Sequence, residues 1–259
     1  MHDFLEVLAT DAVRSIEEGY YETLRRVCSS RLSLREAILK SKNAAIISEI
    51  KFASPSKGTL RKAGDLKKIA RDVELGGAVG ISILTEPKHF KGNIEFIADV
   101  RDQVGIPILM KDIIISPVQI EAASRIGANA VLLIQALFDR GYCEKDAQKM
   151  VEYSHSKGLE VLLESHTEEE FLSALKTDAD MIGINNRNLK TLEVDLGVTR
   201  DILSKYPAND KVIVSESGVN SARDICFLRQ CGAKAFLIGT AVMKAHNIKE
   251  KVRELVKAL

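Results

Sequence analysis

Eight short aliphatic segments recur along the 259-residue chain, and this repetition limits the available folds more than any other feature of the sequence. The segments are rich in Ile, Val and Leu and do not alternate with polar residues, which is typical of strands buried on both faces of a parallel sheet. In chain order they read AAIISEIK, VGISILT, IPILMKD, ANAVLLIQ, GLEVLLES, ADMIGINN, KVIVSESG and KAFLIGTA. The sequence therefore predicts eight parallel strands.

Amphipathic segments of helical period separate these strands, and most of them end at Gly or Pro. Gly-Ala pairs at 77–78, 127–128 and 232–233 are typical of a helix that ends on a left-handed glycine before the chain returns to the sheet. Strict alternation over eight repeats favours closure into a barrel. Two small doubly wound domains are the alternative, but no linker or change in composition divides the chain after residue 46.

We therefore expect an α/β fold that is a single (β/α)8 TIM barrel over residues 46–259. Residues 1–45 precede the first strand, and their apolar spacing in FLEVLATDAVRSIEEGYYETLRRV and LREAILK predicts extra N-terminal helices. These helices would cap or flank the barrel. The whole chain would then form one domain with an N-terminal helical extension.

Charge and composition exclude several classes of function. The 37 basic and 36 acidic residues leave a net charge of +1, which argues against a protein that coats nucleic acid. The basic stretch Lys62–Arg71 is better interpreted as a solvated helix face. We expect no membrane segment, because no apolar run is long enough, and a cytoplasmic location, because the N-terminus lacks the pattern of a secretory signal.

The cysteines and histidines give no sign of a metal site. The four cysteines contain no C-x-x-C spacing, and no two of the five histidines are separated by four residues on a predicted helix. We therefore expect no metal and no cofactor. His166, in ESHTEEEF, is expected to lie in a loop ahead of a helix rather than to take part in chemistry.

Polar residues at the ends of the predicted strands are the candidates for a site, because active sites of (β/α) barrels form at the C-terminal ends of the strands. Any single charged residue there could simply emerge into solvent, but several together favour an acid–base site. Lysines and carboxylates among aliphatic walls are costly unless they are paired. The candidates are Glu49, Lys51, Lys111, Glu164, Asn185, Arg187 and Glu216.

Two further turns are candidates for binding phosphate. Ser217-Gly218 follows the seventh predicted strand and Gly239-Thr240 follows the eighth, and each opens a helical segment with free backbone N–H groups. The first loop, residues 52–58, is polar and contains Pro and Gly. A solvated loop is the simpler interpretation of it, and a mobile lid is the alternative.

An ordered set of motifs resembles the indole-3-glycerol phosphate synthase family from about residue 30 to residue 259. These motifs are ISEIKFASPSKG, PILMKD, LLES, IGINNRNLKTLEVD, VSESGV and FLIGTAVM. The resemblance implies decarboxylative ring closure of 1-(2-carboxyphenylamino)-1-deoxyribulose 5-phosphate to indole-3-glycerol phosphate, carbon dioxide and water. It also implies a phosphorylated small-molecule substrate, no metal or organic cofactor, and a monomer or weak homo-oligomer.

The resemblance also implies roles for individual residues. Lys111 would be the general acid on the ketone oxygen, and Lys51 would hold the substrate carboxylate and release water. Glu164 and Glu49 would stabilise positive charge on nitrogen or remove protons, while Asn185 would orient the substrate or a lysine. The remaining implied contacts are Arg187, Leu189, Glu216, Ser54 and Ser56 to the substrate, and Ser217, Gly218, Gly239 and Thr240 to its phosphate.

One departure and two alternatives bear on this interpretation. Ile113 stands where the family frequently has an aromatic residue, so stacking on the anthranilate ring would be weaker or would come from elsewhere. A barrel resembling phosphoribosylanthranilate isomerase would share the phosphate turns, but it would lack the pair Glu49 and Lys51 together with Lys111. A catalytically silent barrel that binds a sugar phosphate is the other alternative.

Overall fold

Eight parallel strands close into a barrel in the computed structural model of the chain, which describes residues 4–22, 25–27, 32–54, 58–59, 66–208 and 210–259. The barrel strands are β1 (Ala45–Ile50), β4 (Gly80–Leu84), β5 (Ile108–Lys111), β6 (Ala130–Ile134), β7 (Glu160–Ser165), β8 (Met181–Asn185), β9 (Val212–Glu216) and β10 (Ala235–Ile238). Each strand pairs in parallel with the next, and β1 closes the ring against β10. The predicted barrel is confirmed.

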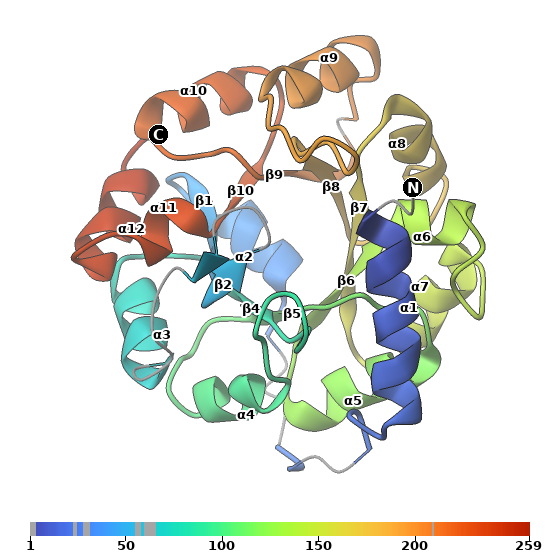
Figure 1. The fold of residues 1–259 in the computed structure, drawn as a ribbon. Helices are drawn as coiled ribbons and strands as arrows, with labels where there is room; N and C mark the ends of the chain where they lie inside the picture. Colours follow the sequence, from blue (N-terminus) through green and yellow to red (C-terminus); the bar gives the residue numbers. More distant parts are fainter. Residues whose placement is uncertain (1–3, 23–24, 28–31, 55–57, 60–65, 209) are drawn as a thin grey trace.

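A ring of helices surrounds the strands (Figure 1). The longer helices are α3 (Leu66–Leu75), α4 (Glu95–Arg101), α5 (Pro117–Ile126), α7 (Ala147–Ser156), α8 (Glu168–Ala174), α9 (Gly197–Lys205), α10 (Ala222–Gln230) and α12 (Ile248–Val256). Two short helices, α6 (Gln135–Asp139) and α11 (Thr240–Met243), directly follow β6 and β10. Helices α3 to α10 lie in the crossovers between successive barrel strands, while α11 and α12 follow the last strand.

Helix α5 shows how the sequence sets these boundaries. Ser116 caps its N-terminus through a capping box with Gln119, and proline occupies the first helical position. The helix stops at Gly127, whose φ of 94° is in the left-handed region. The glycines of the other two Gly-Ala pairs, Gly77 and Gly232, also have positive φ, which confirms the predicted helix ends.

The strands are buried on both faces, and alternate residues point to different cores. Inward-facing side chains form one apolar cluster, which includes Ile47, Leu109, Leu132, Leu162 and Val214. Outward-facing side chains pack with the helices in another, which includes Ile46, Ile83, Met110, Leu163 and Ile213. The inward row continues to the C-terminal ends of the strands, where its residues become polar.

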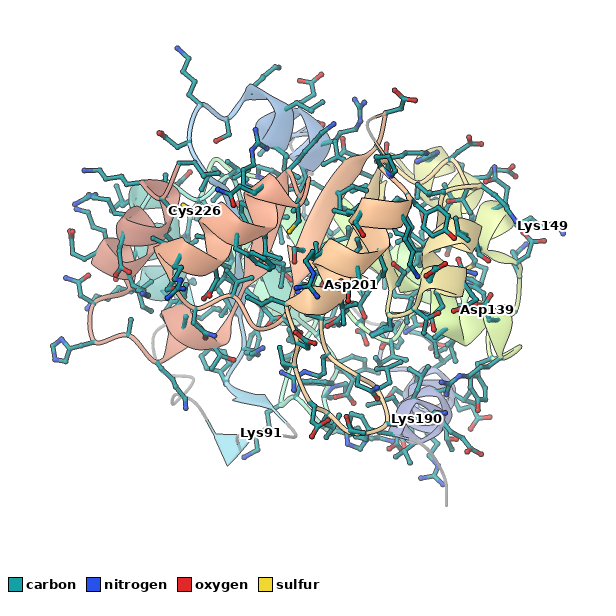
Figure 2. All side chains as sticks on the ribbon, turned by 90° about the horizontal axis from the view of Figure 1, so that it is seen from above. Lys91, Asp139, Lys149, Lys190, Asp201 and Cys226 are labelled. Atoms are coloured by element: carbon teal, nitrogen blue, oxygen red, sulfur yellow. The ribbon has the colours of Figure 1, made fainter. Side chains whose placement is uncertain are left out.

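The N-terminal extension forms two helices, α1 (Phe4–Glu17) and α2 (Leu34–Lys40), as predicted. Figure 2 shows them at opposite ends of the barrel, with α1 at the same end as Lys91 and Lys190. Apolar residues continue at helical spacing beyond Glu17, but helix α1 ends there, because Gly19 turns the chain with a φ of 73°. The extension therefore covers both ends of the barrel.

Side chains from the middle of α1 and from the segment after it attach this region to the C-terminal end of the barrel. Asp11 lies 2.9 Å from Nε2 of His89 and 3.4 Å from Nζ of Lys88, in the loop after β4. The Tyr21 hydroxyl donates to Asp112, which is buried and whose pKa is raised to about 6 by that burial. These contacts hold the extension beside the residue that follows Lys111.

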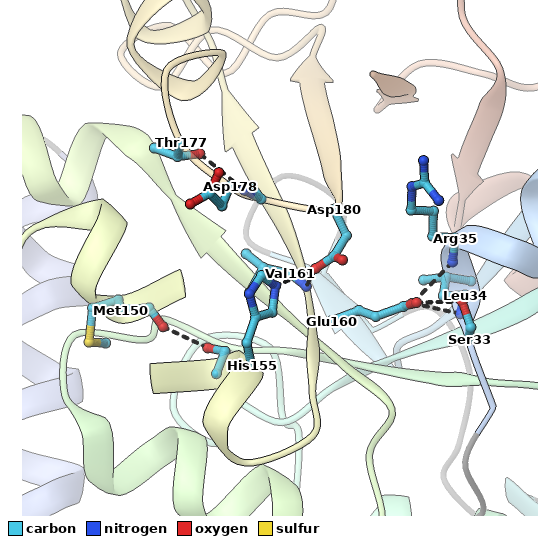
Figure 3. Close-up of polar contacts among 12 residues, drawn as sticks. Ser33, Leu34, Arg35, Met150, His155, Glu160, Val161, Thr177, Asp178 and Asp180 are labelled. Atoms are coloured by element: carbon cyan, nitrogen blue, oxygen red, sulfur yellow. Dashed lines mark hydrogen bonds and ion pairs between the residues drawn. The ribbon is translucent and has the colours of Figure 1, made fainter. Parts of the chain in front are cut away.

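Helix α2 covers the N-terminal end of the barrel, and a carboxylate from the start of β7 fixes it there (Figure 3). The Glu160 side chain accepts hydrogen bonds from the backbone N–H groups of Leu34 (2.7 Å) and Arg35 (3.0 Å) and from the Ser33 hydroxyl. These donors belong to the first turn of α2 and have no partners within the helix. The negative charge of this carboxylate also interacts favourably with the positive N-terminal end of the helix dipole.

The loop after β1 contains a small antiparallel hairpin, β2 (Ala53–Ser54) with β3 (Gly58–Thr59). The side chain of Ser54 and the whole of Ser56 lie outside the described residues, so their predicted contacts with the substrate stay predictions. Over the ranges that the structure describes, no helix has the length and apolarity needed to cross a bilayer.

Candidate active site

A cavity of about 550 Å³ opens at the C-terminal end of the barrel, within the size range of small-molecule sites. Strand ends, the loops after them and helix α1 form its walls. It brings together every predicted site residue except Ser54 and Ser56. Those residues are Glu49, Lys51, Lys111, Glu164, Asn185, Arg187, Leu189, Glu216, Ser217, Gly218, Gly239 and Thr240.

Lys111 lies at the centre of the charged group. Its Nζ is 2.9 Å from Oε2 of Glu164 and 3.1 Å from Oε2 of Glu216, and both carboxylates are almost fully buried. Burial by itself lowers the pKa of Lys111, but the charges of Glu164, Glu216 and Glu49 outweigh it and hold this pKa above its ordinary value. Lys111 is therefore protonated at neutral pH, and its ammonium group lies in the cavity wall.

The two carboxylates beside Lys111 differ in protonation although they share that cation. Burial raises the pKa of Glu216 to about 8, and the neighbouring charge of Glu164 adds to the effect of burial while Lys111 opposes it. Burial also acts on Glu164, but Lys111 and His166 together hold its pKa well below the ordinary value. At neutral pH the pair thus offers one carboxylate and one largely protonated acid.

A glycine makes room for Glu216. In β8, Gly183 pairs with Glu164 on one side and with Val214 on the other. A Cβ atom at this position would lie 2.3 Å from Oε1 of Glu216 and 3.3 Å from the Cα of Glu164. Glu216 can therefore approach Glu164 this closely only because residue 183 is a glycine and has no side chain.

Glu49 and Lys51 form a second ion pair on the wall contributed by β1. Alternation along the strand places both residues on the inward face, as the sequence predicts. Gly239, after β10, leaves space for them, because a Cβ atom there would lie 2.4 Å from Oε1 of Glu49 and 3.1 Å from Nζ of Lys51. Two lysines therefore face three of the four glutamates that line the cavity.

The turn after β9 has an unusual backbone. Ser217 and Gly218 have φ values of 63° and 85°, and both residues line the cavity. The buried side chain of Asn186 holds this turn, since its Nδ2 donates to the carbonyls of Glu216 (2.9 Å) and Ser217 (3.1 Å). Its Oδ1 accepts from Thr199. Asn186 thus ties the end of β8 to the candidate phosphate turn.

The loop after β8 folds over the same side of the cavity. The backbone N–H of Arg187 donates to Oδ1 of Asn185 (3.1 Å), and its Nη1 donates to the carbonyl of Leu192 (2.7 Å). A bridge between Arg187 and Val194 closes this loop on itself. The loop therefore presents Asn185, Arg187 and Leu189 to the cavity as a fixed group.

Apolar residues form the opposite part of the wall. The aromatic side chains there are Phe4 from α1 and Phe90 from the loop after β4. Ile113, Leu132 and Ile134 continue the wall from β5 and β6. Aromatic rings from other segments thus line the same cavity as Ile113, and a flat apolar group of a substrate could bind there.

The sequence gives His166 no expected part in chemistry, but the structure places this residue in the site. It lies in a loop ahead of α8, as predicted, yet it lines the cavity and contacts Glu164. The signal was present in the sequence, because residues 164 and 166 share one face of an extended strand. Asn186 was not singled out either, since nothing in the sequence shows its buried contacts.

The arrangement combines proton donors, proton acceptors and an apolar wall within one cavity. A carbonyl oxygen near Lys111 would meet an ammonium group, and protons on nearby carbon or nitrogen would meet Glu164. Backbone N–H groups at the two turns would suit a phosphate. Of the two turns, Gly239-Thr240 opens a helix as predicted, whereas the same prediction for Ser217-Gly218 is wrong, because α10 begins only at Ala222. This combination fits acid–base chemistry on a phosphorylated, partly aromatic molecule.

Comparisons with known proteins agree with this chemistry. A family profile described as "Indole-3-glycerol phosphate synthase" matches residues 6–255. Relatives with the same name include that of Methanocaldococcus jannaschii, 44% identical over 230 residues (87% of this chain, 84% of the relative). The relative from Methanopyrus kandleri is 42% identical over 229 residues, 87% of each chain.

Solved structures with low sequence identity share the fold. Thiamine phosphate pyrophosphorylase from Pyrococcus furiosus superposes with a TM-score of 0.59 at 18% identity. The superposition covers 87% of this chain and 97% of that one. At this identity the likeness supports the barrel alone, because unrelated activities share such folds.

Proposed function

Because the chain belongs to the indole-3-glycerol phosphate synthase family, we propose that the residues of its barrel mouth divide the steps of that family's reaction among them. The chain is a carboxy-lyase of tryptophan biosynthesis. It converts 1-(2-carboxyphenylamino)-1-deoxy-D-ribulose 5-phosphate to indole-3-glycerol phosphate, carbon dioxide and water. The position of Lys111 between two buried carboxylates is the observation that carries the assignment of roles.

Ring closure begins when the anthranilate carbon that bears the carboxylate attacks the ketone carbon. Lys111 donates a proton to the ketone oxygen, and its charge stabilises the negative charge that develops there. The contacts of Lys111 with Glu164 and Glu216 support this role, because they hold the ammonium group in place inside the cavity. The positive charge that forms on the substrate nitrogen is stabilised by the carboxylates of Glu164 and Glu49.

Loss of carbon dioxide and of water completes the reaction. Lys51 holds the substrate carboxylate until the carbon–carbon bond to it breaks. Glu164 then removes a proton from the carbon beside nitrogen, and Lys51 gives a proton to the departing hydroxyl group. The ion pair of Lys51 with Glu49 supports this role, since it keeps the ammonium group at the cavity wall.

The remaining contacts orient the substrate. Asn185 and Arg187 direct its hydroxyl and carboxylate groups, with Leu189 and Glu216 completing the walls beside them. The turns at Ser217-Gly218 and Gly239-Thr240 bind the phosphate through backbone N–H groups. Ser54 and Ser56 approach the same phosphate from the first loop.

Location and assembly follow from the chemistry and the surface. A phosphorylated anion does not cross membranes freely, so the enzyme acts in the cytoplasm where such a substrate is made and used. We also propose a monomer or a weak homo-oligomer, because the exposed large apolar side chains among the described residues are scattered. Those side chains are Val7, Val13, Leu39, Leu75, Val118, Val194 and Leu259.

The test is turnover of the carboxyphenylamino ribulose phosphate to a fluorescent indole product by the purified chain. Lys111→Ala should reduce kcat by about 10²–10⁴-fold, which is the usual contribution of a positioned general acid. Lys149→Ala is the matched control. Lys149 is exposed on α7 (Figure 2), pairs only with Asp146 in the salt bridges of the described chain, and is not among the residues that line the cavity.

Circular dichroism of both variants separates loss of chemistry from loss of fold. A Lys111→Ala variant with full activity contradicts the role of this lysine. A wild-type chain that binds the substrate and forms no indole product favours the silent barrel.

A further inference from the structure

His166 is a buried charged group that the proposed reaction does not use. It follows β7 and its side chain is only 4% exposed. Nε2 lies 3.1 Å from Oε1 of Glu164, and Nδ1 lies 3.3 Å from Oε2 of Glu170. The ring therefore lies between a carboxylate of the cavity and a carboxylate of helix α8.

The two oxygen atoms of Glu164 face two different cations. Oε2 accepts a hydrogen bond from Lys111, while Oε1 faces His166. The Nε2–H of His166 makes no aligned hydrogen bond with the part of the chain that the structure describes. Nε2 is nevertheless close enough to Oε1 of Glu164 to stabilise the ionised carboxylate, and this effect is greatest when the ring is charged.

The groups that face His166 favour the charged ring. Burial by itself lowers the pKa of His166, but Glu164 from β7 and Glu170 from α8 raise it to about 9. Glu170 is fixed in turn, because the backbone N–H of His166 donates to its Oε2 at 2.7 Å. The ring is therefore an imidazolium at neutral pH.

The charge of His166 changes the balance at the centre of the site. Glu164 and Glu216 compete for the single ammonium group of Lys111, and like charges so close favour a proton on one of them. His166 faces Glu164, whereas no salt bridge within the described chain joins it to Glu216. The additional positive charge therefore moves the shared proton toward Glu216.

We propose that His166 is a positioning residue whose imidazolium keeps Glu164 ionised and leaves the proton of the acid pair on Glu216. This proposal rests on the proposed function, in which ionised Glu164 removes a proton from the substrate. His166 acts through Glu164 and need not touch the substrate. A chain with a neutral side chain at this position would protonate Glu164 at a higher pH than the wild type does.

The test is the pH dependence of kcat/KM for His166→Gln. Removal of the positive charge should move the acid limb upward by about one pH unit or more, since an opposite charge at this distance shifts a carboxylate by that amount. On the sloping part of this limb, the variant should be about tenfold less active than the wild type at the same pH, and the two profiles should converge above it. KM should change little, because the ring binds no part of the substrate.

His155→Gln is the matched control. His155 also pairs with a carboxylate, Asp180 at 2.9 Å, but it lies on α7 and is 38% exposed (Figure 3). Its pH profile should coincide with that of the wild type. If His166→Gln loses the same fraction of activity at every pH, the proposal is overturned, because a loss that does not depend on pH comes from disturbed packing and not from the lost charge.

A second measurement uses the unmodified protein and does not depend on folding of the variant. Nuclear magnetic resonance titration of the His166 ring should show a proton retained until about pH 9. A ring that loses its proton near the ordinary histidine value overturns the proposal even if the variant cannot be purified. Turnover by the wild-type enzyme is measured in parallel. If the wild type makes no indole product, the proposed function is wrong, but the titration still determines the charge of His166.

Discussion

The charged residues of the mouth show how strongly surroundings separate identical side chains. Glu164 and Glu216 contact the same ammonium group and are equally buried, yet their pKa values move in opposite directions. The difference lies in their other neighbours, because Glu164 has a second cation in His166 and Glu216 has none among its described salt bridges. Acid and base roles can therefore be assigned to a pair only when its surroundings are known.

Gly183→Ala tests the close packing on which this pair depends. The new methyl group would meet Oε1 of Glu216, which must then move away from Lys111. We expect kcat to fall by about tenfold to a hundredfold, since displacement of a positioned group by about 1 Å has costs of that size. The indole fluorescence assay measures this loss.

The matched control for that substitution is Gly105→Ala. A Cβ atom at Gly105 would meet only Oε1 of Glu74 at an ordinary contact distance of 3.4 Å, away from the cavity. Both variants should keep the circular dichroism spectrum of the wild type. If Gly183→Ala retained full kcat, Glu216 would not need its present position.

At the scale of elements, the βα loops and the two N-terminal helices place the site on a rigid support. The loops after seven of the eight barrel strands contribute residues to one cavity, as does β6 itself, while the opposite end of the barrel carries α2. Function and stability are therefore separated along the barrel axis, as is usual for this fold. Substitutions at the α2 end should change stability without changing chemistry.

Glu160→Ala tests this separation. The variant loses the carboxylate that accepts from Leu34 and Arg35, so two N–H groups of the first turn of α2 lose their acceptor, while the N-cap Ser33 remains. We expect the free energy of unfolding to fall by about 0.5–2 kcal/mol, the usual cost of removing a helix cap. Chemical denaturation measures this change, and kcat of the folded enzyme should stay at the wild-type value.

Glu36→Ala serves as the comparison for Glu160→Ala. Glu36 is an exposed residue of α2 that pairs with Lys40 one turn later, and such pairs contribute little. Its unfolding curve should nearly coincide with that of the wild type. Equal destabilisation in both variants would show that the hydrogen bonds to Glu160 contribute no more to the free energy of unfolding than an exposed ion pair does.

At the scale of the whole molecule, a nearly neutral chain gathers its chemistry at one end. Its net charge is only +1, but two lysines and three glutamates meet at the mouth, where walls of low dielectric strengthen their interactions. Helix α1 lies over this mouth although it precedes the barrel in the chain. The N-terminal extension is therefore part of the site.

Leu8→Ser measures the contribution of α1 to substrate binding. Leu8 is buried and lines the cavity, so a polar group there should raise KM about threefold to tenfold, with a smaller change in kcat. Val13→Ser is the control on the same helix, because Val13 is 43% exposed. Steady-state kinetics compare the two variants. Equal KM values would show that α1 does not contribute to substrate binding.

Much of the fold could be predicted because hydrophobic periodicity is a local property. The eight aliphatic runs, the Gly-Ala helix ends and the helices before the first strand all appear in the structure. The end of α1 was less predictable, because one turn at Gly19 interrupts an apolar spacing that continues to residue 27. The division into residues 1–45 and 46–259 stays a prediction, although β1 begins at Ala45, one residue earlier.

The sequence by itself determined the barrel, and it also determined which strand ends carry charge, since strand period and strand order suffice to bring those residues to one mouth. Only the tertiary structure decided how the charges pair. It placed Lys111 between two acids, His166 behind one of them and Asn186 beneath the turn at Ser217. The physical reason is that burial and charge–charge interaction depend on distances between distant parts of the chain, which no local pattern contains.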